Sequence, residues 1–267
     1  MLGRDWVIGD VHGAFDLVEQ ALFAVRFRPD VDRLICVGDL VDRGNDSARV
    51  EQFLQQPYVH AVRGNHDHLV ATTDPLVLQA MAISNHNGLR WIGDLSIPRV
   101  RRIQQALAEL PYAIEIASAD GTLPTGIVHA QVPQNWPWPD MVDALSDWPE
   151  EDALFDDVMK SRYKFDSQDA AAVHGVSRVF VGHCICWNGP RILGNTVFTD
   201  TGAVFTGQEE GASLSIIDLS ASNAQIEAAR MDDEHPGLRI CRANSAFEFE
   251  FEFTDAPARD RRTAQRP

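Results

Sequence analysis

Three short motifs rich in acidic, histidine and amide side chains lie in the first quarter of the chain. They are Gly9-Asp10-Val11-His12-Gly13, Gly38-Asp39-Leu40-Val41-Asp42-Arg43-Gly44 and Gly64-Asn65-His66-Asp67. Two further histidines, His129 and His183, stand at the ends of later apolar runs. Carboxylate, imidazole and amide oxygen ligands together suit a divalent ion such as manganese, iron or zinc. The residue types therefore predict a metal site.

The number of these side chains suffices for two ions if one carboxylate is shared between them. Two-metal hydrolases hold their ions about 3.5–4 Å apart and deprotonate a water molecule between them. A single Asp after a strand usually caps a helix, and a single histidine is usually an ordinary polar side chain. These single-residue explanations do not account for three motifs and two histidines that follow one another along the chain. The pattern therefore favours a two-metal hydrolase.

Each motif follows a short apolar, β-branched run of the kind that predicts a strand. Apolar residues recur at helical spacing from Phe15 to Val25, and a second helix is expected at Ser47–Leu54. Alternating strands and helices indicate βαβ units, whose ligands bind at the carboxyl ends of the strands. The segment Pro75–Leu110 is predicted to be mostly helical. The predicted strands are Trp6–Ile8, Leu34–Val37, His60–Val62, Ile114–Ile116, Gly126–Val128, Val179–Val181, Thr196–Phe198 and Leu214–Ile217.

The later strands lack long helices between them, which suggests an added, partly antiparallel sheet. Pro133–Pro139 is rich in Pro and Trp and is predicted to be a surface loop. Phe and Glu alternate in Phe247–Phe253, which predicts a strand that either packs on the core or contacts another chain. We therefore expect one domain at 1–254, with a strand extension at about 221–254. The tail 255–267 is predicted to be disordered.

The composition excludes several classes of partner. The formal net charge of −16 argues against nucleic-acid binding, which depends on Lys and Arg. No apolar run approaches the roughly 20 residues that would span a bilayer, and the N-terminus lacks the apolar stretch of a signal peptide. The four cysteines form no Cys-x-x-Cys pair. These features predict a cytoplasmic protein with no membrane partner, and they leave the oligomeric state open.

At these motifs the sequence resembles the phosphoprotein phosphatase family of calcineurin-like metallophosphoesterases, especially its small bacterial and phage members. The likeness runs from about Trp6 to Leu219 and includes Ser161-Arg162 and Asp200-Thr201-Gly202-Ala203-Val204-Phe205. It implies a four-layer α/β/β/α sandwich with metals at the strand ends between the sheets. It also implies hydrolysis of phosphoserine and phosphothreonine in proteins or peptides, by direct attack of a metal-bridging hydroxide.

The resemblance also implies a role for each motif residue. His66 would act as a general acid or electrostatic stabiliser at the leaving oxygen, oriented by Asp42. Arg43 and Arg162 would bind phosphoryl oxygens, because a guanidinium fork matches them. Manganese is the expected metal, with iron or zinc as alternatives, and two ions would make the pocket locally cationic in an acidic protein. The ligands would be Asp10, His12 and Asp39 for one ion and Asp39, Asn65, His129 and His183 for the other, with Asn65 also near the phosphate.

Some residues depart from the family pattern and support an alternative. Asp67 stands where protein phosphatases usually carry Glu, and Gly-Asn-His-Asp is also common in symmetrical diadenosine tetraphosphate hydrolases. Asn45 stands where Pro is frequent, and the residues before Arg162 differ from the usual ones. Asp42 opposes the alternative, because that group commonly lacks this second acid. The sequence thus favours a serine/threonine phosphatase over a dinucleotide hydrolase or another small-molecule phosphoesterase.

Overall fold

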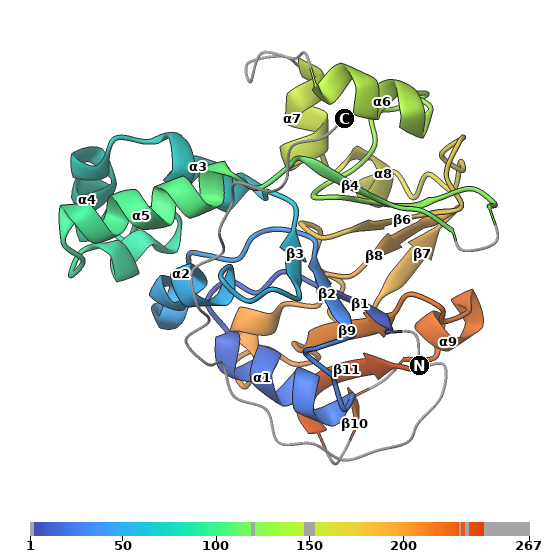
Figure 1. Ribbon diagram of the computed structural model, residues 1–267, viewed down its shortest axis with the longest axis horizontal. Coiled ribbons are helices and arrows are strands. Elements are labelled where there is room, and N and C mark those ends of the chain that lie inside the picture. Colours follow the sequence, from blue (N-terminus) through green and yellow to red (C-terminus); the bar gives the residue numbers. More distant parts are fainter. Residues whose placement is uncertain (1–2, 119–120, 147–152, 230, 233–234, 243–267) are drawn as a thin grey trace.

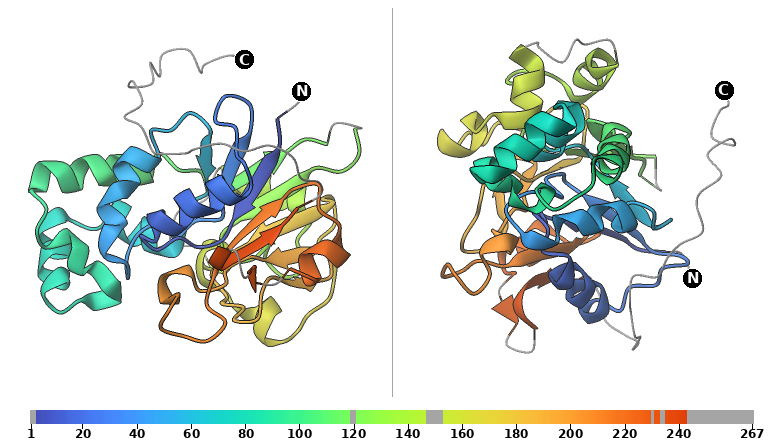
Figure 2. Two further views of the ribbon diagram at one scale, coloured as in Figure 1. Left: turned by 90° about the horizontal axis from the view of Figure 1, so that it is seen from below. Right: turned by 90° about the vertical axis from the view of Figure 1, so that its left-hand side faces the viewer.

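The structure, a computed structural model, describes residues 3–118, 121–146, 153–229, 231–232 and 235–242. Two sheets lie face to face in the middle, and helices cover their outer faces (Figures 1 and 2). This arrangement is the expected four-layer α/β/β/α sandwich, and its layers follow one another from top to bottom in Figure 1. None of the helices in the described ranges is long and apolar enough to cross a membrane.

The first sheet has the strand order β10-β11-β9-β1-β2-β3. Strands β1, β2 and β3 are parallel, whereas β9 runs antiparallel to β1. The carboxyl ends of β1, β2 and β3 therefore meet at one edge. The strands are β1 (Asp5–Ile8), β2 (Arg33–Cys36), β3 (Val59–Ala61), β9 (Leu214–Asp218), β10 (Met231–Asp232) and β11 (His235–Cys241).

The second sheet has the order β4-β5-β6-β8-β7. Its three inner strands β5, β6 and β8 are parallel, and β4 and β7 are antiparallel strands at its edges. It is thus the mixed sheet that the sequence predicts. The strands are β4 (Ala113–Ile116), β5 (Thr125–Val128), β6 (Arg178–Val181), β7 (Arg191–Leu193) and β8 (Thr196–Phe198).

The helices fall into two groups, one for each sheet. On the side of the first sheet lie α1 (Phe15–Ala24), η1 (Asn45–Arg49), α2 (Val50–Phe53), α3 (Asn65–Thr72), α4 (Pro75–Ile83), η2 (His86–Ile92) and α5 (Ile97–Ala108). On the side of the second lie α6 (Trp138–Leu145), α7 (Ala153–Lys160) and α8 (Tyr163–Asp166). Two short helices, η3 (Ala203–Phe205) and α9 (Asn223–Glu227), flank β9 in sequence. Helices α3, α4 and α5 project sideways from the sheets (Figure 1).

Successive residues of the inner strands face different apolar layers. In β1, Trp6 and Ile8 pack in the cluster under the first helical group, whereas Val7 packs between the two sheets. In β6, Phe180 packs between the sheets and Val181 faces the second helical group. Because both faces are covered, these strands are continuous apolar runs, which made them recognisable in the sequence.

The eight predicted strands are all present, to within one residue at either end. The loop prediction for Pro133–Pro139 was wrong at its end, because α6 begins at Trp138 with Pro139 in its first turn, where proline is tolerated. Within the described residues, β7 was not predicted; β10 and β11 lie in the range 221–254 where a strand extension was expected, but their bounds were not predicted. Phe247–Phe253 and the tail 255–267 lie outside the described residues, and the domain limits remain a prediction.

Candidate metal centre

The predicted site residues converge where the carboxyl ends of the two parallel strand sets face each other. Strands β1, β2 and β3 lead into Asp10, Asp39 and Asn65, and β5 and β6 lead into His129 and His183. Asp10 and Asp39 are 2 % and 1 % exposed, and His129 is fully buried. Buried carboxylates are costly unless a cation or hydrogen-bond donors compensate them. The fold therefore gathers these side chains at a considerable energetic cost.

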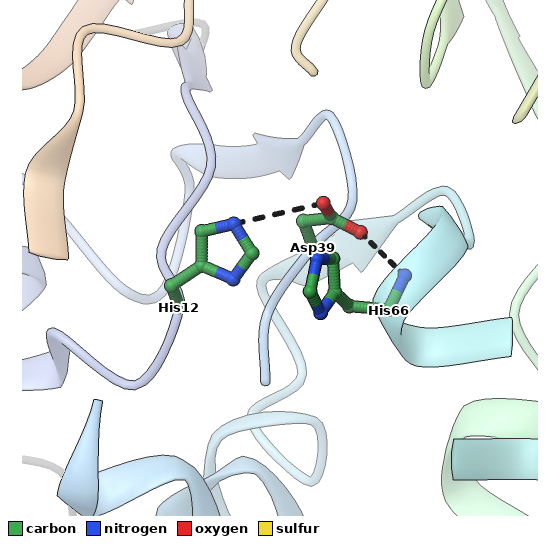
Figure 3. A group of neighbouring side chains, drawn as sticks. All are labelled: His12, Asp39 and His66. Carbon is green, nitrogen blue, oxygen red and sulfur yellow. Dashed lines mark hydrogen bonds and ion pairs between the residues drawn. The ribbon is translucent and has the colours of Figure 1, made fainter. Parts of the chain in front are cut away.

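Asp39 lies at the centre of this group. Its Oδ2 is 3.6 Å from Nε2 of His12 and 3.5 Å from Nε2 of His129. Its Oδ1 accepts a hydrogen bond of 2.9 Å from the backbone amide of His66 (Figure 3). Asp39 belongs both to the group His12–Asp39–His66 and to the group Asp39–His129–His183, each of which could hold a metal ion. A carboxylate common to two such groups is what a two-ion site requires.

Three histidines are fixed by backbone carbonyls in the way that metal-ligating histidines usually are. A carbonyl only accepts, so the bonded ring nitrogen carries a proton and, in the neutral ring, the opposite nitrogen is an acceptor. These opposite nitrogens of His129 and His183 lie 3.0 and 2.9 Å from Oδ1 of Asn65. Two acceptors at this distance repel each other unless a cation lies between them and binds both. The bonded pairs are His12 Nδ1 with Val41 O (2.8 Å), His129 Nδ1 with Val37 O (2.8 Å) and His183 Nε2 with Lys160 O (2.9 Å).

Asp10 provides a separate indication that a cation fits. Its Oδ2 accepts a hydrogen bond of 3.0 Å from the amide of His183, but its buried Oδ1 has no hydrogen-bond partner among the described residues. A Cβ atom on Gly182 would lie 1.9 Å from that oxygen, so glycine leaves room for the carboxylate. Burial, together with the charges of Asp200 and Asp39, raises the pKa of Asp10 well above its ordinary value. A divalent ion would satisfy the oxygen and favour the charged form.

His66 is held by a side chain rather than by a carbonyl. Its Nδ1 lies 2.8 Å from Oδ2 of Asp42, and Oδ1 of Asp42 accepts a hydrogen bond of 2.9 Å from Nε1 of Trp91. Burial lowers the pKa of His66, but the charges of Asp39 and Asp42 outweigh it and the net shift is upward. Trp91 was not predicted from the sequence, because it lies far along the chain from Asp42 and in no motif.

The two predicted phosphate-binding arginines lie at the opening of the site. Arg43 is exposed, and its Nη1 and Nη2 lie 2.7 Å from Nε2 of His12 and 3.2 Å from Nε2 of His66. Arg162 directly precedes α8 and is also exposed. Burial and the charge of His129 lower the pKa of His183 to about 4, and Arg162 contributes to this shift. Arg162 therefore lies near enough to His183 to add positive charge to the site.

Comparison with known proteins places this geometry in a family. The model of the calcineurin-like phosphoesterases matches residues 4–203, well over half of the chain. The chain belongs to the calcineurin-like phosphoesterase family. Members of this family are metallophosphoesterases, so the buried carboxylates, histidines and Asn65 form a candidate site for divalent metal.

Two relatives and one solved structure show how far the likeness extends. Serine/threonine-protein phosphatase 1 of Salmonella typhimurium is 29 % identical over 207 residues, which are 76 % of this chain and 88 % of the relative. The symmetrical bis(5'-nucleosyl)-tetraphosphatase of Serratia proteamaculans is 46 % identical, but over 69 residues, which are 25 % of this chain and 24 % of the relative. A crystal structure provisionally named as a diadenosine tetraphosphatase has a TM-score of 0.57 at 21 % identity and covers 82 % of this chain and 90 % of its own. At that identity the last match shows the fold alone.

The backbone of this phosphoesterase is strained at the site. Residues other than glycine rarely adopt positive φ, which costs about 1–2 kcal/mol each, and such strain gathers at functional sites. Gly64 shows how closely the loops pack, since a Cβ there would lie 2.2 Å from Oδ1 of Asp39. Among the described residues, half of the non-glycine residues with positive φ belong to the site motifs, namely His12, Asp39, Asp42, Arg43 and His183.

Asp67, which the sequence offered as a sign of dinucleotide hydrolysis, is bonded to backbone amides on both carboxylate oxygens. It is fully buried, and its two oxygens accept hydrogen bonds from the amides of Leu40 (2.9 Å) and Gly64 (3.0 Å). It therefore ties the second motif to the third. Because Asp67 has no exposed surface, it offers no contact to a substrate, and its identity does not by itself select one.

Proposed function

We propose that this phosphoesterase is a metal-dependent serine/threonine protein phosphatase. The observation that carries this proposal is the Asp42–His66 pair, with 2.8 Å between Oδ2 and Nδ1. A seryl or threonyl alkoxide is a poor leaving group, so its departure benefits from a positioned acid. Cleavage of a phosphoanhydride releases a phosphate oxygen, which needs less help. A histidine whose pKa is raised by Asp39 and Asp42, against the effect of burial, suits the first reaction better.

The remaining site residues would bind and orient the phosphate. Arg43 and Arg162 would hold its non-bridging oxygens, with the amide of Asn65 beside them. His66 would then donate its proton to the leaving oxygen. Two divalent ions, with manganese expected and iron or zinc as alternatives, would supply positive charge and a water molecule of lowered pKa. Their proposed ligands are Asp10, His12 and Asp39 for one ion and Asp39, Asn65, His129 and His183 for the other.

The similar proteins also support a serine/threonine protein phosphatase. The likeness to the Salmonella phosphatase extends over 88 % of that protein, whereas the likeness to the Serratia tetraphosphatase covers 24 % of that enzyme. Phosphorylated proteins are therefore the proposed substrates. We also propose that the protein acts in the cytoplasm, since its four buried cysteines are free thiols, the state that a reducing compartment maintains.

The second candidate is symmetrical hydrolysis of diadenosine tetraphosphate, favoured by the 46 % identity over the shorter match. The two functions are separated by measuring phosphate release by manganese-loaded protein from a phosphoserine peptide and turnover of the dinucleotide, side by side. We expect a higher kcat/KM on the peptide, and no turnover of either substrate by Asp39→Asn. A higher kcat/KM on the dinucleotide would replace the proposed function by its rival.

The proposed role of His66 has its own test. His66→Asn should lower kcat on a phosphoserine peptide by about 10²-fold or more, the usual contribution of a positioned acid. The loss on p-nitrophenyl phosphate should be much smaller, because p-nitrophenolate leaves without a proton. Equal losses on both substrates would contradict the leaving-group role and remove the observation on which the proposal depends.

A further inference from the structure

Asp200 follows a third parallel strand of the second sheet, beside the two strands that lead into site histidines. Strands β5, β6 and β8 are parallel neighbours, so their carboxyl ends lie side by side. The first two lead into His129 and His183, and β8 leads into Asp200. A Cβ atom on Gly9 would lie 2.3 Å from the carbonyl oxygen of Thr199 and 3.4 Å from Cα of Asp200. Asp200 therefore stands against the loop that carries Asp10.

The carboxylate of Asp200 is buried without an ionic partner in the described part of the chain. It is 2 % exposed, and Oδ1 accepts a hydrogen bond of 2.9 Å from the amide of Gly202, which closes a local turn. Burial raises its pKa to about 6; the hydrogen bond from Gly202 and the charge of Arg43 oppose this rise, and the charge of Asp39 adds to it. Asp200 in turn raises the pKa of Asp10. Three buried carboxylates thus repel one another here, although none of the sequence motifs assigned a role to the third.

The two proposed ion positions differ in their protein ligands. One would have four, from Asn65, Asp39 and two histidines, and the other would have three, from Asp10, His12 and Asp39. Asp200 lies on the side with three, next to Asp10. A further negative charge beside Asp10 would attract the divalent ion expected there, because Coulomb attraction grows as the distance shortens and is little screened in a buried site.

We propose that Asp200 is a further residue of the metal site, which strengthens binding of the ion expected at Asp10 and His12. It does so through its negative charge and its acceptor oxygens, so its role is positioning rather than catalytic. The inference rests on the metal dependence in the proposed function, but not on the identity of the substrate.

Asp218 provides a matched control. It is 6 % exposed, and its Oδ1 accepts a hydrogen bond of 2.9 Å from the amide of Ser220, two residues on, as Asp200 does from Gly202. It ends β9, which is antiparallel to β1 and pairs it with Trp6, so it lies at the sheet edge away from the metal centre. Asp218→Asn therefore removes a buried charge from the same kind of turn without touching the site.

The test compares wild type, Asp200→Asn and Asp218→Asn after removal of metal. Free Mn²⁺ is measured by electron paramagnetic resonance during titration, and thermal unfolding is followed with and without Mn²⁺. Asparagine keeps the oxygen that accepts from Gly202, so the turn is preserved. For Asp200→Asn we expect the Kd of the weaker Mn²⁺ site to rise about tenfold, in the range for residues that support metal ligands. Asp218→Asn should leave both Kd values unchanged.

The two Tm values separate this role from a structural one. Without metal, Asp200→Asn should have a Tm at or above that of wild type, because a repulsive charge is gone, and Mn²⁺ should raise its Tm by less. An unchanged Kd, or a lower metal-free Tm with normal Mn²⁺ binding, would overturn the inference. Asp200→Ser, whose hydroxyl can also accept from Gly202, repeats the test if the first variant does not fold. Loss of Mn²⁺ affinity in a protein that prefers the dinucleotide would uphold this inference while the proposed function failed.

Discussion

The two edges of the first sheet each bury an aspartate, but they compensate its charge in opposite ways. At the amino edge, Asp32 precedes β2 with a fully buried side chain. It accepts hydrogen bonds from Nη2 of Arg4 (2.8 Å) and Nη2 of Arg28 (2.7 Å), and also from both backbone amides. At the carboxyl edge, Asp10 is equally buried, yet one of its oxygens has no hydrogen-bond partner among the described residues.

At these two positions the partners, rather than the burial, distinguish the structural carboxylate Asp32 from the candidate site carboxylate Asp10. Burial alone would raise both pKa values. Hydrogen bonds from Arg28 and Arg4 outweigh it and lower the pKa of Asp32, whereas Asp200 and Asp39 add to it and raise the pKa of Asp10. A buried charge that the chain itself satisfies stabilises the fold. A buried charge that the chain leaves incomplete indicates a ligand from outside.

The largest expected effect comes from the central carboxylate of the site. Asp39→Asn should lower kcat/KM by at least about 10³-fold, or about 4 kcal/mol, because both proposed ions share this ligand. Its free energy of unfolding without metal should decrease. Burial raises the pKa of Asp39, but His129, His66 and His12 outweigh burial and hold that pKa well below its ordinary value, so the charged carboxylate stabilises the folded protein. Phosphate release and urea denaturation, measured on the same metal-stripped and reloaded preparations, check both parts. Full activity of Asp39→Asn would contradict the role proposed for this carboxylate and break the contrast between the two edges.

The opposite effect on activity is expected at the amino edge. Asp32→Asn should lower the free energy of unfolding by about 3 kcal/mol, because Arg4 and Arg28 lose a buried partner. Activity per folded molecule should equal that of wild type. Urea denaturation at pH 7 measures the first quantity, and titration of active sites measures the second. A loss of activity in the folded protein would show that this edge also supports the site.

The stabilisation by Asp32 should also depend on pH with a defined sign. Its pKa in the folded protein lies below the ordinary value of 3.8, so its contribution is complete above that pH. As pH falls from 3.8 toward the lower folded pKa, the carboxylate is protonated and the contribution is lost. The difference in stability between wild type and Asp32→Asn should therefore be constant from pH 7 to pH 5 and shrink in more acidic solution.

Added metal should act on one edge only. Mn²⁺ at about 100 times the Kd of a site should raise the free energy of unfolding by about 2.7 kcal/mol for each ion bound, as expected for a ligand that binds the folded state alone. Asp32→Asn should show the same rise, whereas Asp39→Asn should show almost none. Urea denaturation with Mn²⁺ and with a chelator gives the two values for each protein. A rise in Asp39→Asn as large as that in wild type would place the ion elsewhere.

The sequence predicted the parts of the site that are contiguous in the chain. Asp10 and His12 stand together after β1, and Asp39 and Asn65 follow the next two strands, so strand prediction and residue type sufficed to bring them to one edge. The inner strands were recognisable because they are buried on both faces. Strand β7 was missed, and the bounds of β10 and β11 within the expected strand extension were not predicted, because these sequences lack a run of β-branched apolar residues.

Contacts between distant segments could not be predicted in the same way. Trp91 donates to Asp42, and Asp200 stands against Gly9, but neither contact leaves a pattern within one segment. The arginines around Asp32 pose the same difficulty, since Arg4 reaches it only because β1 and β2 are neighbours. Residue type and spacing predicted the candidate metal ligands. The groups that orient those ligands depend on tertiary packing.

Asp42 gives the finest test of the comparison, because it lies at the site edge but is satisfied by the chain on both oxygens, by His66 and Trp91. It should therefore position His66 and hold no metal. Trp91→Phe removes one donor, which is worth about 1–1.5 kcal/mol, and should lower kcat on a phosphoserine peptide by about tenfold. Mn²⁺ affinity should not change.

Trp138→Phe is the matched control, because it removes a hydrogen bond of 2.8 Å to Glu115 away from the site and should leave kcat unaltered. Weaker Mn²⁺ binding in Trp91→Phe would instead indicate that Asp42 helps to hold the metal. Hydrogen bonds to both oxygens of a carboxylate would then not exclude a role in metal binding.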